Sequence, residues 1–174
     1  MRRSVGRPVF VVGSICLAAG LPTGTASADW PDTGTGFTIE SVAYPGKCLS
    51  TDRDAPQVDV KPCAPRSNSA IWQAIDGTGP SRLQTPKGKQ SKGCLLPGQY
   101  YYVYLSSCKN PARWEYVPGQ GADGTGQIRI DDHGTPRCLR VIHKSETHGG
   151  NVFQAPPCDP AARDQQWRVT PVSN

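Results

Sequence analysis

A short pattern of cysteine, leucine, valine and tryptophan recurs three times in this chain of 174 residues. Each copy has Leu directly after a first cysteine, then a valine-bearing segment, a second cysteine and a tryptophan. The first cysteines are 46 and 44 residues apart, and the tryptophans are Trp72, Trp114 and Trp167. A period of this length indicates a repeat architecture, because one such unit cannot bury its apolar face alone and three must close around a shared core.

The first 28 residues have the features of a secretory signal peptide. Three arginines precede the apolar run from Val9 to Leu21, and residues 26–28 form an Ala-Ser-Ala cleavage pattern. The run is shorter than the roughly 20 residues that span a bilayer, so we expect a secreted, extracellular protein without a membrane span. Cleavage after Ala28 lowers the net charge from +5 to +2, because three arginines leave with the signal peptide. No basic run remains, which argues against nucleic acid as a partner.

Removal of Cys16 with the signal peptide leaves six cysteines, an even number that is typical of a disulfide framework in an exported chain. Six cysteines allow fifteen pairings. The successive gaps are 15, 31, 14, 30 and 20 residues, and the three short gaps occupy equivalent settings in the repeats. We therefore expect one disulfide per repeat, in the pairs Cys48 with Cys63, Cys94 with Cys108, and Cys138 with Cys158.

The mature chain has the patterns of short strands. Segments such as Phe37 to Val42 and Gln127 to Ile130 alternate apolar and polar residues, and turn residues interrupt them every few positions. We expect an all-β fold of three units with about four strands each, beginning near Phe37, Arg82 and Gly126. Residues 29–36 form a leader segment without a pattern of its own.

These repeats resemble the ricin B-type β-trefoil lectins, whose repeats end in Gln-x-Trp. Gln165-Gln166-Trp167 matches in full, and Ala70-Ile71-Trp72 and Ala112-Arg113-Trp114 keep only the tryptophan. The overall look is that of small trefoil proteins exported by actinobacteria. The resemblance implies a closed barrel capped by three hairpins, with pseudo-threefold symmetry and one potential sugar site per repeat. The domain would span residues 37–174, with repeats at about 37–78, 80–118 and 126–170.

The resemblance also indicates which repeat could bind sugar. A family site uses Asp two residues after the first cysteine, a polar and an aromatic residue before the second cysteine, and Asn-Gln before the Trp. Carboxylates and amides form hydrogen bonds with sugar hydroxyls, and the aromatic face packs against the apolar side of the sugar ring. The first two repeats lack both the Asp and the Asn-Gln and look inactive. The third has Arg140 in place of the Asp, keeps Gln154 and Gln165, and has Asp164 where Asn is usual.

An arginine at the centre of the third-repeat site changes the expected ligand. A guanidinium presents donors in a rigid fork that suits carboxylate, sulfate or phosphate, so an acidic glycan is the sharper hypothesis for Arg140, Gln154, Asp164 and Gln165. The alternative is that Arg140 is a solvated surface residue and that Gln165 only ties a turn to the backbone.

A second candidate surface is the tyrosine-rich segment before Cys108. If it is one strand, Tyr100, Tyr102 and Tyr104 form an outward aromatic row, while Val103 and Leu105 face the core. Such a row could stack on glycan, lie under neighbouring loops, or serve a protein partner. The last possibility is the rival function: a protein-binding trefoil, similar to the receptor-binding subunits of cytolethal distending toxins or to trefoil protease inhibitors.

Nothing in the sequence indicates catalysis. His133, His143 and His148 do not form a helical His-Glu-x-x-His metal motif, and no nucleophile and base pair is recognisable. No close Cys-x2-Cys cluster predicts zinc. We therefore expect a non-enzymatic protein without a cofactor or metal. The recurring tryptophans are expected in the core, and Trp30, outside the repeats, has no assigned role.

Overall fold

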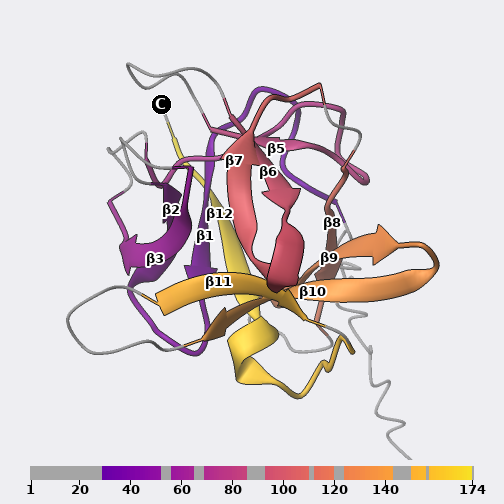
Figure 1. Ribbon diagram of the computed structural model, residues 1–174. Helices are drawn as coiled ribbons and strands as arrows, with labels where there is room; N and C mark the ends of the chain where they lie inside the picture. The colour runs from indigo at the N-terminus through magenta and orange to yellow at the C-terminus, as the bar shows by residue number, and fades with distance from the viewer. Residues whose placement is uncertain are drawn as a thin grey trace, which may run out of the picture.

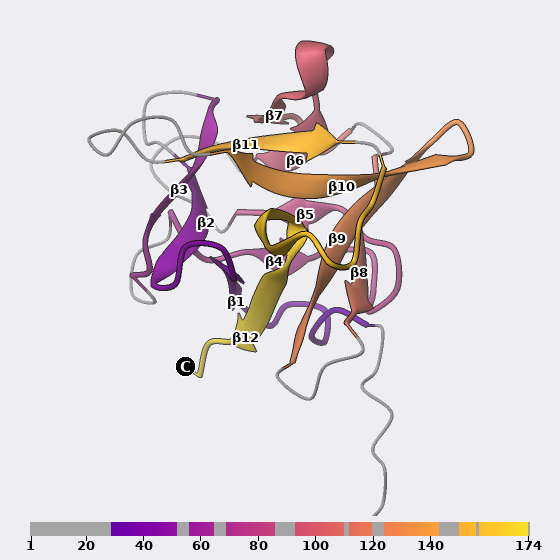
Figure 2. The same ribbon diagram turned by 90° about the horizontal axis from the view of Figure 1, so that it is seen from below.

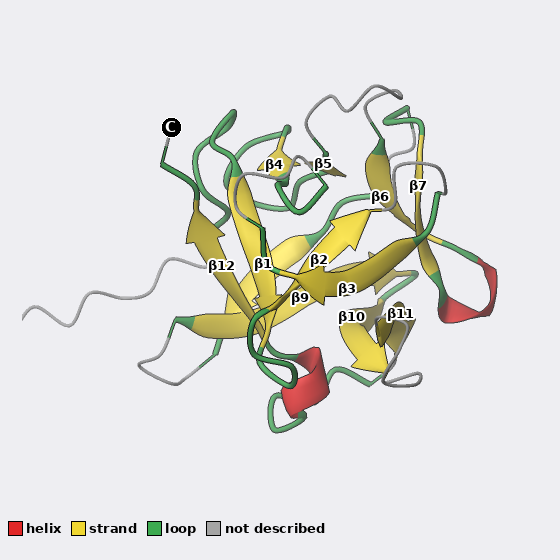
Figure 3. Cartoon of the chain, turned by 90° about the vertical axis from the view of Figure 1, so that its left-hand side faces the viewer, coloured by secondary structure: helices red, strands yellow, loops and turns green. Residues whose placement is uncertain are grey.

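The computed structural model describes residues 29–51, 56–64, 69–85, 93–109, 112–119, 124–142, 150–155 and 157–173. The predicted signal peptide, residues 1–28, lies outside the described residues. Within these ranges the chain forms strands and two one-turn 3-10 helices, η1 (Gln99–Tyr101) and η2 (Arg163–Gln165) (Figures 1 and 3). The predicted all-β fold class is confirmed.

Each repeat contributes four strands, as the sequence pattern predicts. Those of the first repeat are β1 (Phe37–Ser41), β2 (Lys47–Thr51), β3 (Val58–Pro62) and β4 (Gln73–Ala74). Those of the second are β5 (Leu83–Gln84), β6 (Cys94–Pro97), β7 (Val103–Ser106) and β8 (Glu115–Pro118). Those of the third are β9 (Thr125–Asp132), β10 (Thr135–Ile142), β11 (Gly150–Ala155) and β12 (Trp167–Pro171).

The first and last strands of the repeats close into a barrel. β12 pairs with β1, β4 with β5, β8 with β9, and β9 with β12, all antiparallel. Two bridges complete the ring, one between Phe37 and Trp72 and one between Ser81 and Trp114. The middle strands form the hairpins β2–β3, β6–β7 and β10–β11, which meet through pairing of β11 with β3 and of Gln57 with Tyr104 (Figures 1 and 2). This is the β-trefoil arrangement.

All three predicted disulfides are present, one in each repeat: Cys48–Cys63, Cys94–Cys108 and Cys138–Cys158. Each joins a cysteine of the first hairpin strand to a cysteine near or after the end of the second hairpin strand. Closing loops of 15, 14 and 20 residues stabilises each repeat by about 3 kcal/mol, because it restricts the unfolded chain.

The recurring leucines, valines and tryptophans form the core. Each is at most 2% exposed: Leu49, Leu95, Leu139, Val58, Val103, Val152, Trp72, Trp114 and Trp167. Each tryptophan donates its indole N–H to the carbonyl oxygen of the leucine of its own repeat, at 2.9, 2.8 and 3.0 Å in chain order. An indole N–H buried without an acceptor would cost about 1–3 kcal/mol. The same bond therefore satisfies the buried indole N–H in every repeat, so the threefold symmetry extends to these side chains.

Trp30, which the repeat pattern left without a role, belongs to this core. It is 2% exposed, its ring stacks on Phe37 at 5.4 Å between centroids, and its indole N–H donates to the carbonyl of Trp114 at 2.9 Å. Its backbone N–H donates to Thr78 O at 2.6 Å. The segment before the first repeat thus closes the end of the barrel at which β1 begins.

Candidate functional site

Arg140 and Asp164 meet on the outer face of the third repeat. Arg140 lies in β10 and Asp164 in η2. The Nε of Arg140 donates to Oδ2 of Asp164 at 2.6 Å, and the two side chains are 43% and 28% exposed. Two of the four predicted sugar-binding residues are therefore brought together, and they form an ion pair that is partly open to solvent.

Alternation along β10 accounts for the outward position of Arg140. Leu139 and Val141 are buried, and successive residues of a strand point to opposite faces. Ile142 follows on the face of Arg140 and is 43% exposed. Ile142 was not predicted as a site residue, although the alternation of buried and outward residues from Leu139 to Ile142 was a signal that could have identified it.

Part of this ion pair is free to bond a ligand. Within the described part of the chain, Arg140 makes no hydrogen bond beyond the one from Nε, and Asp164 accepts none on Oδ1. The two terminal guanidinium nitrogens therefore offer donors, and Oδ1 offers an acceptor. Beside the exposed Ile142, this set has the donors, acceptor and apolar surface that an amphipathic sugar ring requires.

Gln165 supports the site from inside the protein. It is 4% exposed, its Oε1 accepts the N–H of Asp159 at 2.9 Å, and its Nε2 donates to Pro157 O at 3.2 Å. Gln127 donates to the same Oε1 at 3.3 Å. The amide is used at both ends, so Gln165 ties the turn before η2 to the barrel. This is the alternative role considered for Gln165.

Gln154 lies on β11, and its side chain is not among those that the structure describes. In the backbone register, Gln154 pairs with Leu139, and Phe153 pairs with Arg140. The strand register therefore sets Phe153, rather than Gln154, opposite Arg140.

The corresponding positions of the other repeats offer no comparable group. Ser50 and Leu96, each two residues after a first cysteine, are 1% and 2% exposed. Ser50 donates its hydroxyl to Cys48 O at 3.0 Å. Ala70, which replaces the glutamine of the first repeat, is 1% exposed. Neither Ser50 nor Leu96 presents a side chain at the surface, so the third repeat alone places a charged pair at this position.

The prediction of an even-numbered tyrosine row is wrong. Pro97 pairs with Val103 in the β6–β7 hairpin, so residues 98–102 form its loop and the strand begins only at Val103. Tyr100 and Tyr101 have φ of 54° and 68°, in the left-handed region. The hairpin register, which depends on pairing with β6, overrides the β-preference of tyrosine.

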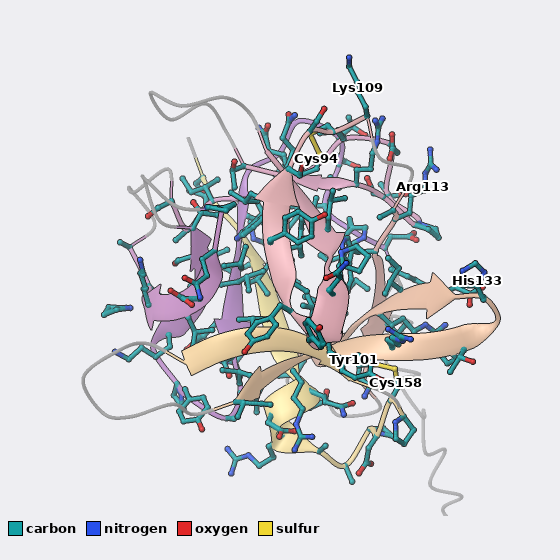
Figure 4. All side chains as sticks on the ribbon, in the orientation of Figure 1. Cys94, Tyr101, Lys109, Arg113, His133 and Cys158 are labelled. Carbon is teal, nitrogen blue, oxygen red and sulfur yellow. A yellow bond between two sulfur atoms is a disulfide. The ribbon has the colours of Figure 1, made fainter. Side chains whose placement is uncertain are left out.

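The tyrosines instead form an exposed tip, which we call the tyrosine tip: Tyr100, Tyr101 and Tyr102, exposed by 84%, 48% and 42%. The guanidinium of Arg137 lies over the ring of Tyr101, 5.0 Å from its centroid, where the tip approaches the third repeat (Figure 4). Tyr104 is half-buried, and any Cβ at Gly98 would come within 2.9 Å of its ring. Gly98 is therefore required for this close approach.

Other features of the described residues do not converge on a site. No group of three or more His, Cys, Asp or Glu among them could hold a metal ion. His133 lies at the tip of the β9–β10 hairpin (Figure 4), and His143 and His148 fall outside the described residues.

An open hollow at the barrel end beside Trp30 is lined by Asp29, Asp32 and prolines, away from the third-repeat site. No helix in the described ranges is long and apolar enough to cross a membrane.

Known structures share this fold. The chain is similar to a designed threefold-symmetric protein, ThreeFoil, with a TM-score of 0.58 and 20% identity over 77% of this chain and 96% of that one. It is also similar to part of a GlcNAcα1-4Gal-releasing endo-β-galactosidase from Clostridium perfringens, with a TM-score of 0.57 and 16% identity over 83% of this chain. A third similar structure is GalNAc-T7 with UDP, GalNAc and Mn2+, with a TM-score of 0.58 and 17% identity over 82% of this chain.

These likenesses establish the β-trefoil fold. The chain spans only 34% and 23% of the length of the endo-β-galactosidase and of GalNAc-T7. No protein-family model matches the sequence, and no curated protein matches it.

Proposed function

We propose that this protein is a secreted, non-catalytic, ricin B-type β-trefoil that binds carbohydrate through its third repeat. The observation that carries the proposal is the Arg140–Asp164 pair, with free donors, a free carboxylate oxygen and the exposed Ile142 beside it. Sugar rings combine hydroxyl edges with apolar faces, and such a set of groups complements both.

Two further observations support the proposal. Two of the similar structures are an endo-β-galactosidase and GalNAc-T7 with UDP and GalNAc, and the parts of them that match cover most of this chain. The signal-peptide pattern and the disulfide in every repeat favour an oxidising, extracellular setting. Extracellular glycans are the carbohydrates that such a protein would meet.

The test is a glycan array with the mature protein, residues 29–174. Arg140→Ala should lower binding about tenfold or more, because it removes the donor fork from the site. The matched control is Arg129→Ala, since Arg129 is also a partly exposed arginine whose Nε bonds a carboxylate, that of Glu115 at 2.8 Å. No glycan signal from the folded wild type, or an equal loss in both variants, would contradict the proposal.

The tyrosine tip supports a second candidate function, binding of a protein partner. Tyr100 is 84% exposed in a backbone conformation that bulky residues rarely adopt, and such strain concentrates at functional positions. Under this proposal Tyr100→Asn abolishes association with the partner, whereas Arg140→Ala leaves it intact. Loss of association in Arg140→Ala but not in Tyr100→Asn, measured with the same purified partner, would exclude the tip as the binding surface.

A further inference from the structure

The charge state of the third-repeat site determines which class of glycan it can take. We infer that the site, as proposed above, selects neutral glycans over anionic ones, because Asp164 already neutralises Arg140. This inference rests on the proposed function and names its ligand class. It departs from the expectation of an acidic glycan, which treated Arg140 as a free cation.

A ligand at this site meets a cation that is already paired with an anion. Arg140 and Asp164 are joined at 2.6 Å, so together they present a dipole and no net charge. An anionic group bonded to the terminal nitrogens of Arg140 would also lie within a few ångströms of the Asp164 carboxylate. That distance is shorter than the Debye length of about 8 Å in physiological salt, so the repulsion is not screened.

The hydrogen-bonding groups of the pair also suit a neutral sugar. A neutral sugar can accept from the terminal nitrogens of Arg140 and donate a hydroxyl to Oδ1 of Asp164, and neither bond disturbs the bond from Nε to Oδ2. Asp164 thereby supplies the acceptor that is missing two residues after Cys138, where Arg140 stands. The carboxylate reaches the site from η2 instead of from β10, and Gln165 holds the turn beside it.

The other arginines near the pair that the structure describes direct their side chains elsewhere. Arg163, next to Asp164 in η2, directs its Nη2 to Val42 O at 3.3 Å. Arg137 is three residues before Arg140 in the same strand and lies over Tyr101. Since residues at odd separation in a strand face opposite sides, Arg137 belongs to the other face of β10. Within the described ranges, Arg140 and Asp164 are therefore the charges that define the site.

The test uses Asp164→Asn, which keeps the size of the side chain and removes its charge. An array should pair each neutral glycan with its sulfated and uronic-acid counterparts. Wild-type protein should bind the neutral members better. Asp164→Asn should raise the signal for the anionic members about tenfold, because Arg140 becomes an unpaired cation, and should weaken the neutral ones.

Two controls make the result specific. Glu115→Gln releases Arg129 in the same way but outside the site, and it should leave the array pattern unchanged. The double variant Asp164→Asn with Arg140→Gln should lose the gained anionic signal. Circular dichroism and thermal melting confirm that each variant is folded.

The outcomes separate the inference from the proposed function. A wild type that prefers sulfated or uronic glycans, or an Asp164→Asn variant with no anionic gain, overturns the inference and leaves carbohydrate binding in place. Failure of the wild type and of every folded variant to bind any glycan overturns both.

Discussion

At the scale of single residues, one ion pair outside the candidate site ties two repeats together. Asp76, in the turn after β4, accepts from Arg82 Nε on both carboxylate oxygens, at 3.1 and 2.9 Å. Arg82 also donates to Cys108 O at 2.6 Å, and Arg113 lies 3.4 Å from Asp76. The hydrogen bonds from Arg82 outweigh desolvation and lower the pKa of Asp76 to about 2.

This lowered pKa predicts an acid-dependent contribution to stability. A carboxyl whose folded pKa lies below its unfolded value stabilises the fold above about pH 4, and the contribution is lost as pH falls toward 2. Asp76→Asn should lower the free energy of unfolding at pH 7 by about 1–2 kcal/mol. Urea denaturation of both proteins at pH 7 and pH 2.5 checks this, and a difference that is undiminished at pH 2.5 would contradict it.

The candidate site shows how far residue-level prediction reaches. Arg140 and Asp164 were both predicted as ligands, because each matches a position of the repeat pattern. Their pairing was not predicted, since the two residues are 24 positions apart and only the fold brings them together. Gln165 was predicted for its match to the Gln-x-Trp motif, but whether its amide faces a ligand or a turn depends on loop 157–159.

At the scale of elements, the β6–β7 hairpin combines a strained loop with a constrained base. The Cys94–Cys108 disulfide joins its two sides, and Gly98 N–H donates to Tyr102 O at 2.7 Å across the loop. Tyr100, nearly fully exposed, makes little contact that would offset its left-handed backbone. The strain therefore remains in the folded state.

Replacement of Tyr100 should relieve this strain. Asn tolerates the left-handed region better than an aromatic residue, so Tyr100→Asn should raise the free energy of unfolding by about 0.5–1 kcal/mol. Thermal melting would then show a midpoint a few degrees higher, together with the lost partner binding described above. Tyr104→Asn, in the adjoining strand, should destabilise instead; a lower midpoint for Tyr100→Asn would mean that the tip is held by packing.

The same hairpin marks a limit of pattern-based prediction. Alternation correctly placed Val103 in the core, because that residue lies within the strand. It failed for Tyr100 and Tyr102, because the start of β7 is determined by pairing with β6 rather than by local composition. Strand existence was predictable from local sequence, whereas the exact end of a strand required its neighbour.

At the scale of the whole molecule, closure of the barrel depends on a residue outside the repeats. Trp30 contacts Phe37 of the first repeat, and it bonds Trp114 and packs on Tyr116 of the second. The threefold pattern predicted the barrel because its signals recur. It could not predict Trp30, which occurs once and therefore gives no periodic signal.

Trp30→Ala should consequently destabilise the fold as much as the loss of a buried tryptophan of the repeats. Loss of a buried tryptophan costs about 3–5 kcal/mol, because the cavity is only partly filled by relaxation. Trp30→Phe keeps a ring but loses the bond to Trp114 O, and it should cost less. Thermal melting of the mature protein distinguishes them, and a midpoint for Trp30→Ala close to that of the wild type would show that the core ends at Phe37.

The bond from each tryptophan to the leucine of its own repeat has a consequence for which positions can vary. It uses an inward indole and a backbone carbonyl, so its acceptor does not depend on any side chain. The position after the leucine can therefore differ from repeat to repeat while this bond stays the same, as Ser50, Leu96 and Arg140 do. Such a scaffold is suited to protein engineering, in which recognition is introduced one repeat at a time.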